Sequence, residues 1–365
     1  MDTPKNIEET SRKVVRIGIS IGDVNGISPE VIMKALSDNR MMVDCTPIIY
    51  GSTKFFSIQK KVNNIEEFNY QSIDSVDAAI NGKINIINII SGEVEVKLGE
   101  PTKISGEYAV KSLDAATKDL ASGKIDVLVT APISKEAMAK ADFKFTGHTE
   151  YLADLAGIDE ALMMMVSPTL RVALVTSHIA LKEVTTTITI DKVYNKIVEF
   201  NNSLKKDFGI QRPKIAVFGV NPHAGENGKM GEEEKDVIIP AIQKAKNEGM
   251  FAYGPFPADG FFGSSNRNHY DGILAMYHDQ GLAAFKALSF DEGVNFTAGL
   301  PVVRTSPDHG TAYDIAGKGI ASGDSMRNAI YIAIDVYRRQ QNEKEISMNP
   351  LETQPRRDRK SEYSK

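Results

Sequence analysis

Three histidines, His178, His223 and His278, could together bind a divalent cation, because imidazole nitrogens are common metal ligands. Each follows a short apolar run, rich in β-branched residues, of the kind that forms a buried strand of a parallel sheet. These runs lie at residues 171–176, 214–220 and 272–277. Ligands of open α/β sheets bind at the carboxyl ends of strands, so the three imidazoles could converge there.

Each histidine alone has a simpler interpretation, as a hydrogen-bonded surface residue at a strand end. The spacings of 45 and 55 residues between them also match no compact metal motif. However, the same placement occurs at three of only 6 histidines in the chain. This repetition favours the metal site.

A second group, Lys286, Asn295 and Arg304, offers two cations and an amide, a set suited to the oxygens of a phosphate. A solvated lysine is the simpler interpretation of Lys286. Arg304 follows the apolar residues 301–303, and a charge at the end of a buried strand needs a partner. We therefore expect Arg304 to bind an anion.

Two glycine-containing turns could also bind a ligand. In residues 22–30 (GDVNGISPE), backbone N–H groups could hold an anion, or the glycines could serve turn geometry alone. This turn has neither a GxGxxG pattern nor the lysine of a P-loop. In residues 145–150 (FTGHTE), His148 and Thr149 could donate to a substrate, and Thr149 could equally be the N-cap of a helix starting at Glu150.

Residues 308–319 (DHGTAYDIAGKG) form a segment of small residues in which backbone could approach a flat ligand closely. An irregular connection is the alternative.

The elements that must position these residues alternate between strands and helices, which predicts repeated βαβ units and an α/β fold with mostly parallel strands. Besides the three runs above, strands are predicted at residues 14–21, 46–50, 84–90 and 125–130. Helices are predicted at residues 29–36, with Ser28 as N-cap, and at 105–122, 191–206, 232–247 and 325–339.

A chain of 365 residues predicts two domains. We expect a discontinuous first domain of residues 14–132 and 305–340, and a second of residues 133–304 that carries the metal ligands and a dimer interface. The polar segments 1–13 and 341–365 are expected to be disordered tails.

Composition excludes several classes of protein. A net charge of −5 with no dense basic stripe in the body of the chain argues against nucleic-acid binding. A single cysteine, Cys45, allows no intramolecular disulfide and favours a reducing compartment. The sequence contains no apolar stretch of a length that spans a bilayer and no secretory signal, so we expect a cytoplasmic protein with no membrane partner.

Taken together, eight strings resemble the 4-hydroxythreonine-4-phosphate dehydrogenase family of pyridoxine biosynthesis, in order and in spacing. They are GDVNGISPE, TAPISKEAM, FTGHTEYLA, VTSHIAL, GVNPHAGENG, GPFPADGFF, MYHDQGLAAFK and GVNFTAGLPVVRTSPDHGTAYDIAGKG, between residues 14 and 339. The family is related to the isocitrate and isopropylmalate dehydrogenases. The resemblance therefore implies two α/β/α lobes with the active-site cleft between them at a dimer interface.

The resemblance also implies a role for each candidate residue. It implies a divalent metal, zinc or alternatively cobalt or magnesium, on His178, His223 and His278, with the last supplied by the other subunit of a homodimer. It implies substrate contacts from His148, Thr149, Lys286, Asn295 and Arg304. By its relation to the dehydrogenases above, it implies NAD or NADP binding by His309, Gly310, Thr311, Ala312 and Asp314. Asp259 and Asp279 are candidates to orient a ligating imidazole or to carry a proton.

The implied reaction is oxidation of a phosphorylated hydroxy acid by NAD(P), followed by decarboxylation. The family's usual first turn reads GDPAGIGPE, and this chain departs from it at Val24, Asn25 and Ser28. Paralogues that oxidise threonate or erythronate 4-phosphate have much the same ligand set, so the substrate stays open among these compounds. The alternative from another class is a non-catalytic protein that binds a phosphorylated metabolite. A third hypothesis is an acyl or phosphoryl transferase, but the sequence contains no P-loop or GxSxG motif that would support it.

Overall fold

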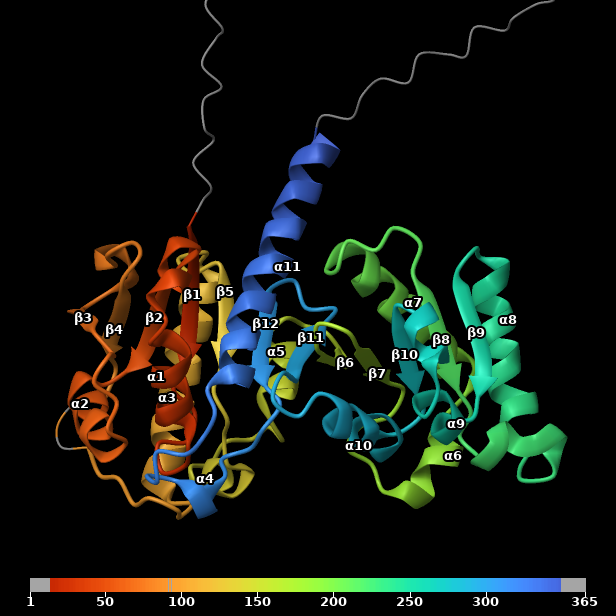
Figure 1. Ribbon diagram of the computed structural model, residues 1–365, viewed down its shortest axis with the longest axis horizontal. Coiled ribbons are helices and arrows are strands. Elements are labelled where there is room, and N and C mark those ends of the chain that lie inside the picture. The colour runs from red at the N-terminus through yellow and green to blue at the C-terminus, as the bar shows by residue number, and fades with distance from the viewer. Residues whose placement is uncertain (1–13, 91, 93, 349–365) are drawn as a thin grey trace, which may run out of the picture.

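The computed structural model describes residues 14–90, 92 and 94–348. Its strands form one 12-stranded sheet in the order β3-β4-β2-β1-β5-β12-β11-β6-β7-β10-β8-β9, with helices on both faces (Figure 1). The predicted α/β fold with mostly parallel strands is confirmed. A single continuous sheet runs through both halves of the molecule.

The first half of the sheet is parallel throughout. Its strands are β1 (Val15–Ser20), β2 (Cys45–Gly51), β3 (Tyr70–Ile73), β4 (Ile84–Asn88), β5 (Val127–Thr130) and β12 (Val303–Pro307). Its helices are α1 (Ser28–Leu36), α2 (Thr53–Val62), α3 (Lys103–Ala121), α4 (Lys135–Lys140) and α11 (Asp324–Met348). Short 3-10 turns cover Asn39–Val43 and Val76–Ala78.

In the second half, β7 (Arg171–Leu174), β8 (Lys214–Phe218), β9 (Phe251–Phe256) and β10 (Gly272–Ala275) are parallel to one another. The antiparallel strands β6 (Leu162–Val166) and β11 (Val294–Ala298) join this set to β12. The helices are α5 (His148–Leu155), α6 (Val184–Thr187), α7 (Ile190–Lys206), α8 (Ile239–Asn247), α9 (Ala258–Phe262) and α10 (His278–Leu288). Shorter turns cover Leu181–Glu183, Pro222–Gly228, Glu234–Ile238, Ser265–His269 and Tyr313–Ile315.

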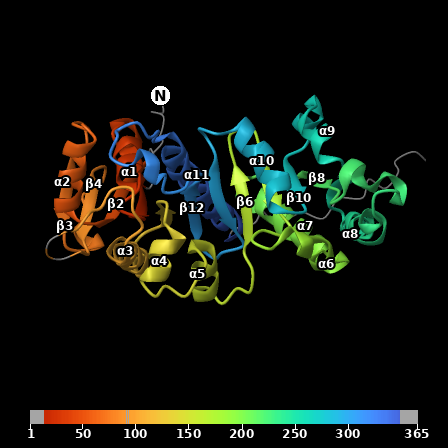
Figure 2. The same ribbon diagram turned by 90° about the horizontal axis from the view of Figure 1, so that it is seen from below.

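The two parallel sets run in opposite directions where β11 and β6 join them. A twist of roughly 20–25° between neighbouring strands accumulates across such a wide sheet and turns the outer strands around. The segments that follow β5, β7 and β10, namely α4, α6 and α10, consequently all lie on the lower side of Figure 1, the side that Figure 2 views. Residues from both halves can therefore meet there.

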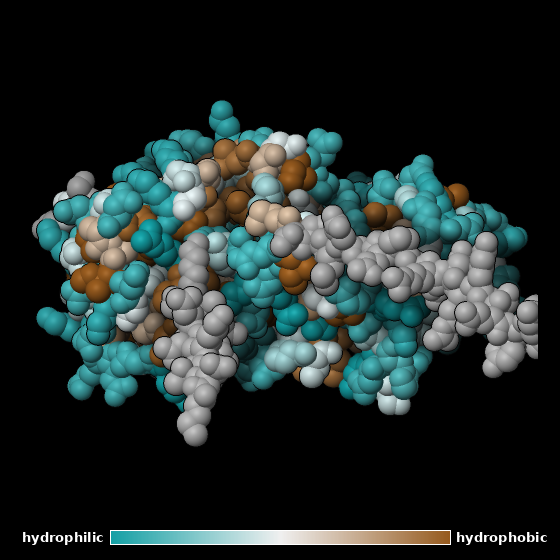
Figure 3. Space-filling model, turned by 90° about the horizontal axis from the view of Figure 1, so that it is seen from above, coloured by the Kyte–Doolittle hydropathy of each residue, from teal (hydrophilic) through white to brown (hydrophobic). Residues whose placement is uncertain are grey.

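Helices cover both faces because each contributes one apolar face to the core. Leu113, Ala116 and Leu120 of α3 belong to one buried cluster, with Ile48 and Leu128 of the sheet. The apolar residues of α1, α2, α7 and α11 belong to a larger one. The face from which α11 projects is mostly hydrophilic with scattered apolar groups (Figure 3).

All predicted strands and helices are found, with shifted ends, but two expectations at helix ends are wrong. The N-cap of α1 is Ile27, and Ser28 is the first helical residue, with its hydroxyl donating to the carbonyl of Pro132. Helix α11 continues to Met348, so no disordered tail begins at residue 341. The predicted tail 1–13 and the remainder of the predicted tail 341–365, from residue 349 on, lie outside the described residues.

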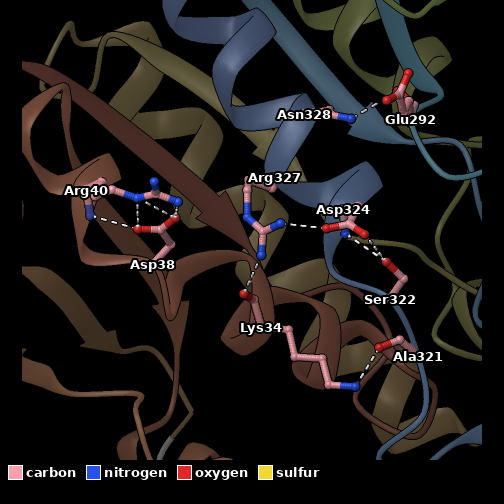
Figure 4. Close-up of polar contacts among 9 residues, drawn as sticks. All are labelled: Lys34, Asp38, Arg40, Glu292, Ala321, Ser322, Asp324, Arg327 and Asn328. Atoms are coloured by element: carbon pink, nitrogen blue, oxygen red, sulfur yellow. Dashed lines mark hydrogen bonds and ion pairs between the residues drawn. The ribbon is translucent and has the colours of Figure 1, made fainter.

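The C-terminal helix is bound to the first half of the molecule through α1 (Figure 4). Arg327 donates to the carbonyl of Lys34, and the Lys34 ammonium donates to the carbonyl of Ala321. Buried Glu30 accepts from the Ala321 N–H and pairs with Lys34. Strand β12 also pairs with β5 of the first half, beginning at Val303. The chain therefore re-enters the first half of the sheet slightly before residue 305, the expected boundary of the first domain. In the described part of the chain, no helix is long and apolar enough to cross a membrane.

Candidate active site

Arg304 lies near the start of β12 and is almost fully buried, with 3% of its surface exposed. Its guanidinium donates to the hydroxyls of Thr130 (2.7 Å) and Thr297 (3.0 Å), and Nη2 lies 3.3 Å from Nδ1 of His148. Burial lowers the pKa of Arg304 to about 10, and the nearby carboxylate of Glu150 acts in the opposite direction. A buried cation held by neutral groups is suited to receive an anion.

His148 is the first residue of α5, and its ring is buried. Burial, and then the charge of Arg304, lower its pKa well below 6.5, so the ring is neutral. The N-cap of α5 is Gly147, so the alternative of Thr149 as N-cap is wrong. Thr149 is the second helical residue and lines a cavity with Glu150 and His178. The first turn of α5 thus lies between the buried Arg304 and one of the three histidines.

His178 and His278 lie close together, with ring centroids 5.9 Å apart. They follow β7 and β10, which are parallel neighbours that pair Leu174 with Ala275. Two imidazoles on one zinc ion have centroids roughly 5–6 Å apart, given Zn–N bonds of about 2.0–2.1 Å. The spacing of this pair therefore fits joint ligation.

Each ring of the pair has a carboxylate against Nδ1. Nδ1 of His278 lies 2.7 Å from Asp279 Oδ1, and Nδ1 of His178 lies 3.7 Å from Glu150 Oε1. A carboxylate accepts hydrogen bonds, so the 2.7 Å contact favours a proton on Nδ1 of His278 and leaves its Nε2 as the ligating nitrogen, whereas the 3.7 Å separation at His178 is that of an ion pair. Asp259, the other predicted orienting residue, is exposed on α9, and no side-chain contact joins it to these histidines in the described residues.

His223 does not join this pair. It is exposed in the turn Pro222–Gly228 after β8, in a left-handed conformation (φ 53°). Within residues 14–90, 92 and 94–348 of one chain, no three His, Cys, Asp or Glu side chains are grouped to hold a metal ion. Within one chain His278 lies beside His178, because β7 and β10 are neighbours. The implied origin of the metal-binding His278 in the other subunit stays a prediction.

Two cavities open beside His178. One, of about 450 Å³, is lined by residues of α5, β6 and the segment after β7, including Thr149, Glu150 and Met163. The other, of about 500 Å³, is lined by His178, His278 and Asp279, with the apolar Ile179 and Leu181. A small phosphorylated substrate could fit beside the histidine pair in either volume.

The predicted phosphate group is only partly assembled. Lys286 on α10 pairs with Asp308, with Nζ 2.9 Å from Oδ1, and no contact joins it to Arg304 in the described residues. Burial raises the pKa of Asp308, and the hydrogen bond from Lys286 acts against this. Asn295 is two residues before Thr297 on β11, and its buried Oδ1 has no hydrogen-bond partner among the described residues.

The segment implied to bind the nucleotide packs on the first turn. The carbonyl of Thr311 accepts from Ile27 N–H (2.9 Å), and the hydroxyl of Tyr313 donates to buried Asp23 (2.7 Å). Ala312 is left-handed (φ 42°), and the buried Nε2 of His309 has no partner among the described residues. Gly310 and Asp314 belong to the same segment.

The N–H groups of the first turn bind protein oxygens. Those of Asp23 and Ile27 donate to the carbonyls of Pro132 and Thr311, and that of Asn25 donates to the side chain of Asp23. The glycines therefore serve turn geometry, as at Gly22 (φ 63°), where a Cβ would lie 2.2 Å from the carbonyl of Pro132. The anion-binding interpretation of this turn is not supported.

Sequence reasoning missed Thr130, Thr297 and Glu150. The first two are neutral residues inside strands, and only the pairing of β12 with β5 and β11 shows that they face Arg304. Glu150 directly follows His148 and Thr149 in the FTGHTE turn. Its position, as an acidic residue in the first turn of a helix next to two candidate site residues, is the signal that could have identified it.

Comparison with known proteins shows the family of the chain. Residues 43–333 match the model of the family described as pyridoxal phosphate biosynthetic protein PdxA. The chain is 49% identical to a 4-hydroxythreonine-4-phosphate dehydrogenase of Bacteroides thetaiotaomicron over 93% of both chains. It is 41% identical, over 88% of its length and 97% of the relative's, to a protein of Oceanobacillus iheyensis assigned as a D-threonate 4-phosphate dehydrogenase.

Among solved structures, the chain resembles the 4-hydroxythreonine-4-phosphate dehydrogenase of Klebsiella pneumoniae. The TM-score is 0.76 at 34% identity, over 90% of this chain and 99% of that one. The family match covers well over half of the chain, and the relatives are aligned over nearly their whole length. The chain therefore belongs to the PdxA family of pyridoxal phosphate biosynthetic proteins, and it is a dehydrogenase.

Proposed function

We propose that this enzyme oxidises 4-phosphooxy-L-threonine with NAD or NADP and then decarboxylates the product to 3-amino-2-oxopropyl phosphate. The first turn of α5 carries this proposal, because His148 contacts the buried anion-binding Arg304 and Glu150 contacts His178 of the histidine pair. One end of a substrate can bind at the arginine while its reacting carbon lies at the histidines.

The phosphate end of the substrate binds to Arg304, with Asn295 and Lys286 contributing. The unpartnered Oδ1 of Asn295 supports a role for this residue in ligand binding. Lys286 must exchange its contact with Asp308 for the phosphate. The neutral ring of His148 accepts from Arg304 at Nδ1, so its Nε2–H is free to donate to the substrate. Binding energy gained at the phosphate orients the reacting carbon.

Two of the three proposed ligands are placed so that they could hold a divalent metal together. His178 and His278 supply two imidazoles at a suitable spacing, and each has a carboxylate at Nδ1. His223 is the third proposed ligand, and since it is not grouped with the pair in the described part of one chain, a second protomer would have to complete the set. Bound there, zinc, cobalt or magnesium would withdraw electron density from the substrate hydroxyl and stabilise the negative charge left by decarboxylation. Three imidazoles without a thiolate suit zinc.

Oxidation removes a hydride from C3 and the proton of its hydroxyl group, which passes to solvent. The C1–C2 bond then breaks with loss of carbon dioxide, and the enolate that remains takes up a proton from solvent at C2. The nicotinamide accepts the hydride. The segment of His309, Gly310, Thr311, Ala312 and Asp314 is the proposed nucleotide site, and the contact of Tyr313 with Asp23 holds it against the first turn.

A homodimer with shared active sites is part of the proposal. Leu181 and Ile179 line the cavity beside His178, and 71% and 38% of their surfaces are exposed. Large apolar side chains at the mouth of a polar cavity favour a protein partner there.

The direct test mixes the purified protein with zinc, either nicotinamide and a panel of substrates, and follows absorbance of the reduced nicotinamide. The panel contains 4-phosphooxy-L-threonine, D-threonate 4-phosphate and D-erythronate 4-phosphate. Turnover of the first with the highest kcat/KM supports the proposal. D-threonate 4-phosphate is the second candidate substrate, because the chain is similar to the Oceanobacillus protein. A higher kcat/KM for this compound would show that it, and not 4-phosphooxy-L-threonine, is the substrate. Substrate binding without any reduction of the nicotinamide would indicate a binding protein.

A further inference from the structure

We propose that Glu150 is a positioning residue, which orients His178 for metal binding through a hydrogen bond from Nδ1–H. This inference rests on the metal site of the proposed function. It adds a residue that neither the histidine set nor the predicted orienting aspartates included.

Geometry places Glu150 against the ring that it would orient. It is the third residue of α5, and its Oε1 lies 3.7 Å from Nδ1 of His178. Both side chains line the cavity of about 450 Å³ and are close to half exposed, at 41% for Glu150 and 49% for His178. A small approach of the carboxylate would bring the two atoms to hydrogen-bond distance.

The second ring of the pair has a carboxylate at the same nitrogen, at a shorter distance. Asp279 lies at Nδ1 of His278, at 2.7 Å, so each of the two neighbouring imidazoles has its own carboxylate. The two carboxylates come from different elements, α5 and α10. A carboxylate on the outer nitrogen fixes the tautomer, limits rotation of the ring and raises the basicity of the inner nitrogen.

Glu150 is also close to the phosphate site. Its negative charge acts on the buried guanidinium of Arg304, which contacts His148 two residues earlier on the same turn. Movement of α5 would therefore change the contact of Glu150 with His178 and that of His148 with Arg304 together. A carboxylate in the first turn of a helix also stabilises the helix through its interaction with the helix dipole. The experiment must separate this purely structural role from the orientation of His178.

Two substitutions separate these roles. Glu150→Gln and Glu150→Leu both remove the charge at the helix start, but only glutamine keeps an oxygen that can accept from Nδ1–H. Asp159→Asn is the matched control, because Asp159 lines the same cavity and the change also removes one negative charge there.

The first measurement is zinc affinity of the dimeric protein by calorimetry, with nitrogen NMR of the His178 ring in the metal-free protein as the second. We expect Glu150→Leu to weaken zinc binding by about 10- to 100-fold, Glu150→Gln by less, and Asp159→Asn not at all. The wild-type ring should carry its proton on Nδ1, and the leucine variant should lose this preference. Thermal unfolding of the metal-free variants shows whether each remains folded.

Equal zinc affinity in the wild type and in folded Glu150→Leu, with an unchanged His178 tautomer, would overturn the inference. So would an equal loss in the glutamine and leucine variants, because it would assign the effect to charge alone. His178→Ala separates this failure from failure of the proposed function. If His178→Ala does not weaken zinc binding either, the metal site itself is wrong.

Discussion

Nη2 of Arg304 lies 3.3 Å from Nδ1 of His148, and this contact determines how the histidine can act. A guanidinium can only donate, so Nδ1 must accept and the ring must be neutral. Burial and the same positive charge lower the pKa of His148 accordingly. The pair thus presents a cation and an Nε2–H donor side by side, which suits a phosphorylated substrate.

Replacement of Arg304 by alanine should raise KM for the phosphorylated substrate by about 10- to 100-fold, the effect of losing charge-assisted hydrogen bonds to one ligand. KM for the nicotinamide should change little, because the proposed nucleotide segment does not contact Arg304 in the described residues. Steady-state kinetics with each substrate varied in turn measure both effects.

The control for this prediction is Arg40→Ala. Arg40 is an exposed arginine that pairs with Asp38 on the first half of the molecule (Figure 4). Equal increases of both KM values in the Arg304 variant would show that the phosphate binds elsewhere.

The three histidines could be predicted as candidate site residues because β-branched runs identify the strands β7, β8 and β10. Ligands of open α/β sheets bind at the carboxyl ends of such strands. The environment of Arg304 was not predictable in this way. It depends on Thr130 and Thr297 in neighbouring strands. No strand was predicted at β11, and Arg304 was expected at the end of a strand, whereas it lies near the start of β12. Local sequence carries no signal for such long-range pairing. The position of His223 was missed because residues 223–227 adopt positive φ angles, and four of these five residues are not glycine.

Stability of the metal-free protein should fall as the pH drops below 6.5, partly because of His148. Its pKa is lowered in the folded state, so between the two pKa values the unfolded chain binds the additional proton. This stability is fully present above 6.5 and is lost as the pH falls towards the folded-state pKa. The raised pKa of buried Asp23 acts with the opposite sign, from its ordinary 3.8 upward.

Urea unfolding between pH 5 and pH 8 measures this dependence, and His148→Asn isolates the contribution of the ring. Asparagine can still accept from Arg304 but does not titrate. The variant should lose less stability than the wild type between pH 7 and pH 5. An identical slope in both proteins would mean that His148 is not held neutral.

The contacts between α1 and the segment that leads into α11 should contribute much of the free energy that holds the C-terminal helix to the first half of the molecule. Glu30 is buried, accepts from the Ala321 N–H and pairs with Lys34. Glu30→Ala leaves a buried N–H without its partner and should lower the free energy of unfolding by about 2–3 kcal/mol. Chemical denaturation measures the change.

Arg40→Ala, which breaks the exposed pair with Asp38, is the comparison and should leave the unfolding midpoint nearly unchanged. Similar midpoints for Glu30→Ala and Arg40→Ala would show that the buried contact contributes little.

Removal of the metal should stop oxidation without unfolding the protein. A chelator, or His223→Ala, should abolish reduction of the nicotinamide, because the exposed His223 contributes to the metal and not to the core. Activity before and after addition of zinc, with circular dichroism as the control for folding, measures this. Full turnover of chelated His223→Ala would remove the metal from the reaction.

Subunit mixing tests the central claim, a metal site shared between two protomers, most directly. His178→Ala and His223→Ala should each be inactive alone. When their subunits are exchanged, each heterodimer should contain one intact site, and a random mixture should then contain roughly a quarter of the wild-type number of sites. The mixture of His178→Ala with His278→Ala should remain inactive, because the structure pairs these residues in one chain. Recovery only in the second mixture would contradict that pairing, and recovery in neither would contradict the shared site.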